Sequence, residues 1–282
     1  MSIKSNYSDW IGREEVLTDS IYEQRVNALA ATLDCEPKFS KNDNFPPLWH
    51  WILFNSQHMA SELGHDGHAQ KGGFLPPIDL PRRMWAGGRF EFIKPLKVGE
   101  NITRTSTIKN VSQKVGRSGQ LAFVTVDHVI KGDNGGHWIE EHDIVYREAA
   151  KQIWQSPKEP IVDTEKGDWS EVVTPDPVLL FRYSALTFNG HRIHYDREYC
   201  INAEGYPGLV FHGPLTATLL INLIRKHLPA AKVEDFHFKA LRPLFDNFQL
   251  TLHGRVEGER VFLWAKDQWG QRAMEAVAKI NL

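Results

Sequence analysis

Two segments in the second half of the chain gather residue types that suit acid–base chemistry. Residues 182–196 carry two histidines, an asparagine, an aspartate and two arginines in a run without strand alternation. Residues 208–214 place His212 and Gly213 just before a proline, where an apolar helix is expected to begin. A loop dense in donors and acceptors, followed by a helix N-terminus, can present chemistry to a bound carbonyl. We interpret these segments as an active site that the rest of the chain supports.

The bulk composition is that of an ordinary globular protein. Its 282 residues, 41% hydrophobic and 24% charged, suit two modest domains or one duplicated domain. A net charge of −2 gives no electrostatic basis for a nucleic-acid or anionic-membrane partner. Cys35 and Cys200 have no metal-type spacing, which favours a reducing compartment. Because the sequence shows neither a signal-peptide core nor a membrane-spanning run, we expect a cytoplasmic protein.

The elements predicted before residue 150 are two helices, a long loop and a group of strands. Apolar residues at helical spacing predict helix over 9–35 and again over 48–63. The Gly- and Pro-rich loop 65–88 is long for a compact domain, and such loops tend to be functional. Four strands are predicted after it, at 89–93, 101–111, 120–131 and 137–147.

The second half repeats this plan after a Pro-rich linker at 151–176. Residues 214–227 form the most apolar helix of the chain, and Pro229 ends it. Four further strands are predicted, at 236–241, 249–257, 260–266 and 272–281. Residues 90–96 align with 238–244 through an aromatic residue followed by a basic-Pro-Leu corner. We therefore expect an internal duplication, in which a long helix wrapped by an antiparallel sheet occurs twice.

These segments resemble the MaoC-like enoyl-thioester hydratases, which have the hotdog fold. The family motif places an aspartate five residues before a histidine, and a later glycine opens the central helix; the corresponding positions here are Asn189, His194 and Gly213. The resemblance covers essentially the whole chain. Within the family, residues 73–88 and 184–196 are most similar to bacterial itaconyl-CoA and mesaconyl-C4-CoA hydratases. The chain departs from the wider family at Asn189, where an acid is usual.

The resemblance implies an α+β double hotdog. Residues 1–150 would form an N-terminal unit like a fatty-acid-synthase-type dehydratase, and 177–282 a C-terminal MaoC-like unit with the hydratase motif. The implied activity is reversible hydration of itaconyl-CoA or mesaconyl-C4-CoA to citramalyl-CoA, as in itaconate degradation. A 3-hydroxyacyl-thioester dehydratase of fatty-acid synthesis is the alternative, and a non-catalytic acyl-CoA-binding hotdog is another. We expect a homodimer that uses no cofactor and no metal.

Adding water to an enoyl thioester needs a base for the water, an acid for the α carbon and donors for the enolate oxygen. His194 is the candidate base, because imidazole titrates near neutral pH. Asn189 can hold the water through its amide. The N–H of Gly213, at a helix start, can bind the thioester oxygen.

Other interpretations of the same residues stay open. His194 can be a structural histidine, and Gly213 a turn residue before a helix. His191 and His194, together with Asp196 or His212, have a spacing that can ligate a metal ion. Asp196 can instead cap a helix or pair with a neighbouring arginine.

The arginines of the long loop bear on substrate size. A short dicarboxylate bound as a CoA thioester has a free carboxylate, which a guanidinium binds in bidentate fashion. Arg82, Arg83 and Arg89 are candidates for this clamp; alternatively they bind CoA phosphates or face solvent. Trp85 can line the acyl site, and His212 is placed with the substrate-binding residues.

Overall fold

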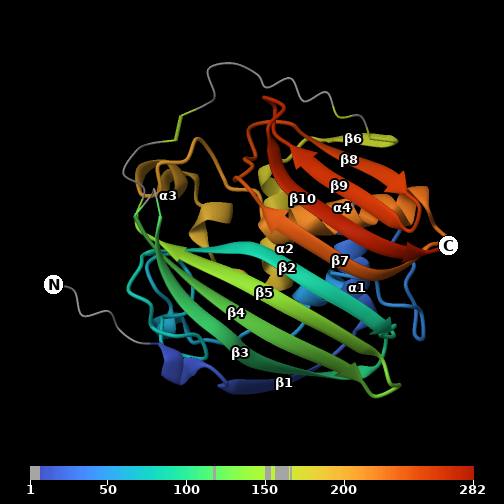
Figure 1. The fold of residues 1–282 in the computed structure, drawn as a ribbon, viewed down its shortest axis with the longest axis horizontal. Coiled ribbons are helices and arrows are strands. Elements are labelled where there is room, and N and C mark those ends of the chain that lie inside the picture. Colours follow the sequence, from blue (N-terminus) through green and yellow to red (C-terminus); the bar gives the residue numbers. More distant parts are fainter. Residues whose placement is uncertain (1–6, 117–118, 150–153, 156–164, 166) are drawn as a thin grey trace.

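One ten-stranded sheet runs through the whole molecule in the order β1-β3-β4-β5-β2-β7-β10-β9-β8-β6, and its neighbouring strands pair antiparallel (Figure 1). The computed structural model describes residues 7–116, 119–149, 154–155, 165 and 167–282. The first half contributes β1 (Glu14–Ser20), β2 (Arg82–Lys94), β3 (Asn101–Gly116), β4 (Gly119–Gly132) and β5 (His137–Arg147). The second half contributes β6 (Trp169–Val173), β7 (Lys232–Ala240), β8 (Leu250–Glu257), β9 (Arg260–Lys266) and β10 (Arg272–Asn281).

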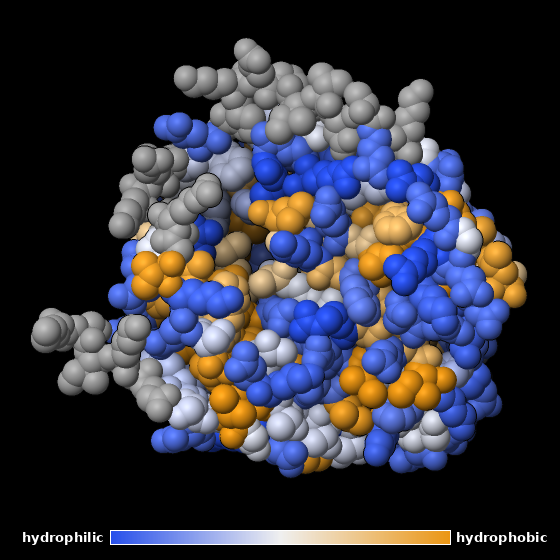
Figure 2. All heavy atoms as spheres, viewed as in Figure 1, coloured by the Kyte–Doolittle hydropathy of each residue, from blue (hydrophilic) through white to orange (hydrophobic). Residues whose placement is uncertain are grey.

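The strands form because their side chains alternate between a polar and an apolar face. On β4, Val124, Val126 and Ile130 are buried while their sequence neighbours are half-buried or exposed. Successive side chains of a strand point to opposite faces, so this pattern commits one face of the sheet to the core. Figure 2 shows polar side chains over much of the opposite face, with apolar side chains interspersed.

The two halves join through β2 and β7 at the middle of the sheet. Gly88 pairs with Phe238, and a Cβ on Gly88 would lie 2.9 Å from ring atoms of Phe238 and Phe90. A Cβ on Gly87 would lie 2.7 Å from the carbonyl oxygen of Phe238. Glycine at both positions therefore lets the central strands approach and the aromatic rings stack beside them.

The helices lie on one side of this sheet. They are α1 (Glu23–Thr32), α2 (Pro177–Thr187), α3 (Arg197–Asn202) and α4 (Gly213–His227), with 3₁₀ turns η1 (Ser8–Trp10), η2 (Trp49–Ile52), η3 (Ala60–Glu62) and η4 (Arg192–His194). Helix α4 packs behind β7 to β10 (Figure 1). Its buried side includes Leu215, Leu220 and Ile224, and Pro214 occupies its first turn. The helix predicted at 214–227 is confirmed.

The helix predicted over 9–35 is correct only in its second part, where α1 lies, and the helix predicted over 48–63 is wrong. Residues 9–35 contain β1 before α1, because Glu14 to Ser20 pair along β3 with residues 101–107. Residues 48–63 hold only the turns η2 and η3. Leu48 and Phe54 have φ values of 65° and 57°, which a right-handed helix does not allow. The first half therefore lacks the long helix that a strict repeat would require, and its helix is the ten-residue α1.

The strand predictions agree with the structure in number and order, apart from the two edge strands. β2 begins at Arg82, so the long loop is shorter than the predicted 65–88. Much of the predicted linker, 151–176, lies outside the described residues. Its described part contains β6, which pairs with β8. No helix in the described part of the chain is long and apolar enough to cross a membrane.

Candidate active site

His194 is held in one tautomer by the backbone. It ends the η4 turn, and its Nδ1 lies 2.7 Å from the carbonyl oxygen of Val210. Because a carbonyl oxygen only accepts, Nδ1 carries the proton and Nε2 carries the lone pair. The side chain is 8% exposed, and burial lowers the pKa of His194 to about 4. The imidazole is therefore neutral at physiological pH and can accept a proton through Nε2.

His194 also lies beside the start of α4, as the sequence predicted. Its ring stacks on that of His212 with the centroids 3.7 Å apart, and His212 is the residue before the helix. His212 Nε2 in turn lies 2.9 Å from Ser184 Oγ. Next to it, a Cβ built on Gly213 would meet no atom within 4 Å. The side-chain direction of Gly213 is therefore unobstructed, and the start of α4, where the helix dipole favours negative charge, lies next to the two imidazoles.

Asn189 is positioned by the end of α2. Phe188 takes the left-handed conformation that ends the helix, with φ of 51°, and the N–H of Asn189 donates to the carbonyl of Ser184 at 2.8 Å. The side-chain oxygen of Asn189 accepts from the N–H of His191 at 3.1 Å. This bond fixes the amide with its oxygen turned to the backbone, which leaves the NH₂ group for other partners.

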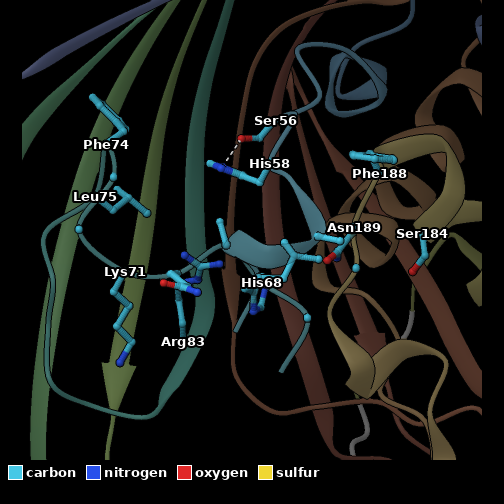
Figure 3. Close-up of a pocket in the computed structure, with 18 of the residues that line it drawn as sticks. Ser56, His58, His68, Lys71, Phe74, Leu75, Arg83, Ser184, Phe188 and Asn189 are labelled. Atoms are coloured by element: carbon cyan, nitrogen blue, oxygen red, sulfur yellow. Dashed lines mark hydrogen bonds between the residues drawn. The ribbon is translucent and has the colours of Figure 1, made fainter. Parts of the chain in front are cut away.

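A cavity of about 750 Å³ opens between the two halves (Figure 3). Its wall comes from the loop 56–76, from Arg83 on β2 and Tyr146 on β5, and from residues of α2 and the turn after it. Asn189 and Ser184 belong to this wall. His194 does not line the cavity, and one side chain separates it from the wall residues on each of two sides. On one side, Ser184 contacts His212, which stacks on His194. On the other, His68 contacts His191, whose ring centroid is 5.5 Å from that of His194.

Among the three candidate arginines, Arg83 lines this cavity. The structure does not bring the other two to it. Arg82 donates to the Glu204 carboxylate at 2.8 Å and lies over the ring of Tyr206. Arg89 binds Asp143 at 2.6 Å and also Glu141, so two carboxylates already hold it.

Trp85 is also away from the cavity wall. Its ring packs edge-on against Trp51, with centroids 4.9 Å apart, and 3.9 Å from the ring of His142. Its indole N–H donates to the carbonyl of Gly87 at 2.9 Å. Trp85 therefore belongs to the aromatic packing of the first half, beside the central strands.

Comparison with known proteins agrees with this architecture. The family model of hydroxyacyl-thioester dehydratase type 2 matches residues 48–246, which is more than half of the chain. This chain belongs to that family. It is 44% identical to the mesaconyl-C(4)-CoA hydratase of Chloroflexus aurantiacus over 278 residues, covering 98% of this chain and 99% of the relative. It is 28% identical to the mitochondrial hydroxyacyl-thioester dehydratase type 2 of Schizosaccharomyces pombe, covering 84% and 88%.

Solved structures show the same fold. A MaoC-like dehydratase from Phytophthora capsici superposes with a TM-score of 0.70 at 15% identity, covering 98% of this chain and 99% of that one. A dehydratase of the MaoC domain class from Chloroflexus aurantiacus gives 0.61 at 11% identity, covering 96% and 94%. The MaoC-like resemblance and the α+β double hotdog are thus confirmed, and family membership places the chain among the hydro-lyases.

The sequence alone did not identify Asp66 and His68, two residues of the long loop before β2, as candidate site residues. Asp66 Oδ2 lies 3.0 Å from His68 Nδ1, and the His68 ring is 4.0 Å from that of His191. The only local signal was the long Gly-rich loop that contains them. Burial lowers the pKa of His68 below its ordinary value of 6.5, although the hydrogen bond that His68 donates to Asp66 raises it. Burial likewise lowers the pKa of His191.

The metal arrangement suggested by the sequence does not form. Asp196 caps α3 by accepting from the N–H of Tyr199 at 2.9 Å, and it pairs with Arg192 at 2.7 Å. Its carboxylate is therefore committed to structural bonds. His212 and His194 stack face to face, which does not aim their nitrogens at one point.

Proposed function

We propose that the protein reversibly hydrates a short enoyl-CoA that carries a free carboxylate, with mesaconyl-C4-CoA or itaconyl-CoA giving citramalyl-CoA. The observation that carries this proposal is the near full-length 44% identity to a mesaconyl-C(4)-CoA hydratase. The cavity supports it, because Arg83 in its wall has no ion-pair partner among the described carboxylates. An arginine in that position suits a substrate carboxylate.

In the proposed reaction with mesaconyl-C4-CoA, whose double bond is conjugated to the thioester, His194 Nε2 takes a proton from water as the water oxygen attacks the β carbon. Asn189 holds that water through its amide. The N–H of Gly213 binds the thioester oxygen as negative charge develops there, and such a donor typically lowers the barrier by about 3 kcal/mol. Because His194 lies behind the wall residues, the acyl group must enter between His191 and Ser184 to reach it.

We further propose that residues 1–150 and 177–282 are two hotdog units and that the protein acts as a cytoplasmic homodimer. The antiparallel seam between β2 and β7 supports the division, since each half supplies one side of it. The dimer and the compartment are supported by the family resemblance.

The direct test is to incubate the protein with mesaconyl-C4-CoA, itaconyl-CoA and crotonyl-CoA. Loss of enoyl-thioester absorbance measures the first and the third, and chromatography of the acyl-CoA measures itaconyl-CoA, whose double bond is not conjugated to the thioester. A higher kcat/KM for either dicarboxylate thioester supports the proposal. A preference for crotonyl-CoA supports the second candidate, a 3-hydroxyacyl-thioester dehydratase, which the match to the yeast enzyme favours. Binding without turnover would refute both.

Replacing Arg83 by glutamine should lower kcat/KM for the dicarboxylate substrates by about 10- to 100-fold and spare crotonyl-CoA. A charged hydrogen bond contributes about 1.5–3 kcal/mol. Crotonyl-CoA has no free carboxylate on its acyl group, so it makes no such bond to Arg83. Arg89→Gln is the matched control, because Arg89 pairs with Asp143 and Glu141 away from the cavity. Equal losses on all three substrates would count against the clamp.

A further inference from the structure

Asp66, His68 and His191 form a cluster that the proposed reaction has not used. One side-chain nitrogen or oxygen atom from each lies within 4.8 Å of the others. Asp66 and His68 come from the loop before β2, whereas His191 precedes η4 in the second half. The cluster thus crosses the junction of the two halves at the wall of the cavity, because His68 itself lines the cavity.

The loop is anchored where it meets the second half. A Cβ on Gly67 would lie 1.9 Å from the carbonyl oxygen of Gly190, and Gly67 has φ of 86°. The N–H of Arg192 donates to the carbonyl of Asp66 at 2.9 Å, and the Arg192 guanidinium donates to that of His65 at 3.0 Å. Only glycine fits this close approach. The position of His68 is therefore set by the fold.

The proposed reaction includes a second proton transfer. His194 takes a proton from water, and a proton must also be delivered to the α carbon, a step for which a second imidazole at the cavity is suited. Asn189 stands where the family motif has an acid, and an amide cannot supply that proton. A titratable side chain in the wall of the cavity is placed to supply it.

His68 has the geometry for this task. Asp66 accepts from Nδ1–H, which leaves Nε2 as the free nitrogen of the ring. A carboxylate on the far nitrogen orients an imidazole and stabilises its protonated form. Figure 3 shows His68 in the cavity wall, drawn between Arg83 and Asn189. A substrate carboxylate on Arg83 would bring the carbons of the double bond next to this ring.

We propose that His68 is a second catalytic residue, which exchanges the α-carbon proton, and that Asp66 positions it. This inference rests on the proposed function. In hydration, the water oxygen bonds to the β carbon while its proton passes to His194 Nε2. The electron pair of the double bond moves to the thioester oxygen as the enolate. When the enolate collapses, a C–H bond forms at the α carbon with the proton from His68 Nε2, and solvent exchange resets both imidazoles.

A metal site at the same residues is less consistent with the charges around them. Arg83 lies close enough for its positive charge to lower the pKa of both His68 and His191. The same charge would oppose a divalent cation. The groups that face His68 are thus Asp66 from its own loop, Arg83 from β2 and His191 from the second half.

The test compares His68→Gln, Asp66→Asn and the control His65→Gln, each in the full-length protein, with the substrate that the wild type hydrates best. His65 is the matched control, since it lies on the same loop with an exposed side chain. His68→Gln should lower kcat by about 10²-fold or more with little change in KM, and His65→Gln should change neither. A kcat for His68→Gln within about threefold of wild type would overturn the proposal, even where the proposed function holds.

The pH profile separates catalysis from a structural role. As an acid in hydration, His68 must be protonated, so the rate falls as pH rises through its pKa. Asp66→Asn removes the hydrogen bond and charge that raise this pKa. In Asp66→Asn, the alkaline limb of the kcat profile should therefore move to lower pH than in the wild type. An alkaline limb that does not move would overturn the proposal. This comparison does not depend on whether His68→Gln folds. Activity that EDTA abolishes and Zn²⁺ restores would also overturn it, whereas a wild type that hydrates none of the three substrates would refute the proposed function itself.

Discussion

Replacing His194 by glutamine should reduce kcat by about 10²- to 10⁴-fold while KM changes little, because the base acts in the transition state. Glutamine keeps a side chain of similar reach at this position but cannot take the proton from water. The Nδ1 bond to Val210 fixes Nε2 as the proton acceptor. Steady-state loss of enoyl absorbance measures the effect. Since the pKa of His194 is lowered to about 4, wild-type hydration should lose this base only as pH falls toward that value.

His237→Gln is the control for this variant, because His237 is exposed on β7. It should keep the wild-type kcat. A folded His194→Gln protein with more than about a tenth of wild-type activity would exclude His194 as the base, since general-base catalysis typically contributes 10²-fold or more. Turnover in the cavity would then require a base other than His194.

Replacing His50 by alanine should lower the free energy of unfolding by about 3–5 kcal/mol, which is the usual cost of leaving a buried charge, here the Glu140 carboxylate, without its partner. His50 Nε2 lies 2.9 Å from Glu140 Oε2, and the Trp51 indole N–H donates to the other oxygen at 3.2 Å. Both members are almost fully buried. Without His50, the Glu140 carboxylate would be left in the core with one neutral donor. Urea unfolding at neutral pH measures the loss.

This pair also predicts how stability depends on pH. Burial raises the pKa of Glu140, but the charge and hydrogen bond of His50 lower it further, and the net shift is below its ordinary value of 4.5. A carboxylate with a lowered pKa stabilises the fold above its unfolded pKa and loses that effect as pH falls below it. His50→Ala should therefore lose less stability at acidic than at neutral pH. The double variant with Glu140→Gln should recover part of the loss, and a single-variant cost under about 1 kcal/mol would contradict the argument.

In the second half, α4 and the strands β7 to β10 were predictable because their sequence patterns and their packing agree. Helix α2 was not predicted, since its residues 182–187 were interpreted as part of a loop. The stripe of α4 and the alternation in β7 to β10 are both local, and the structure buries the residues that those patterns select. In the first half, β1 is an edge strand whose partner residues lie more than 80 positions away, so its helical spacing was misleading. The apolar run 48–63 fails as a helix because tertiary packing holds Leu48 and Phe54 in left-handed conformations.

The site was predictable where its residues lie close together in the sequence. The motif placed His194 next to the start of α4, which the structure also shows. It could not reveal His68, because the contact with His191 spans more than 120 residues. Arg82 and Arg83 are adjacent on one strand, so their side chains leave opposite faces and only one could enter a given cavity. Which one does so depends on how β2 lies against the loop, and no local pattern states that.

The continuous ladder through β2 and β7 restricts how this protein can move. Two domains joined by a flexible connection can open by a hinge, but here such an opening would break the hydrogen bonds from Gly87 to Glu91 and separate the stacked rings of Phe90 and Phe238. Entry and exit of a ligand must therefore proceed without a hinge at this seam, with the sheet acting as a rigid frame for the cavity wall.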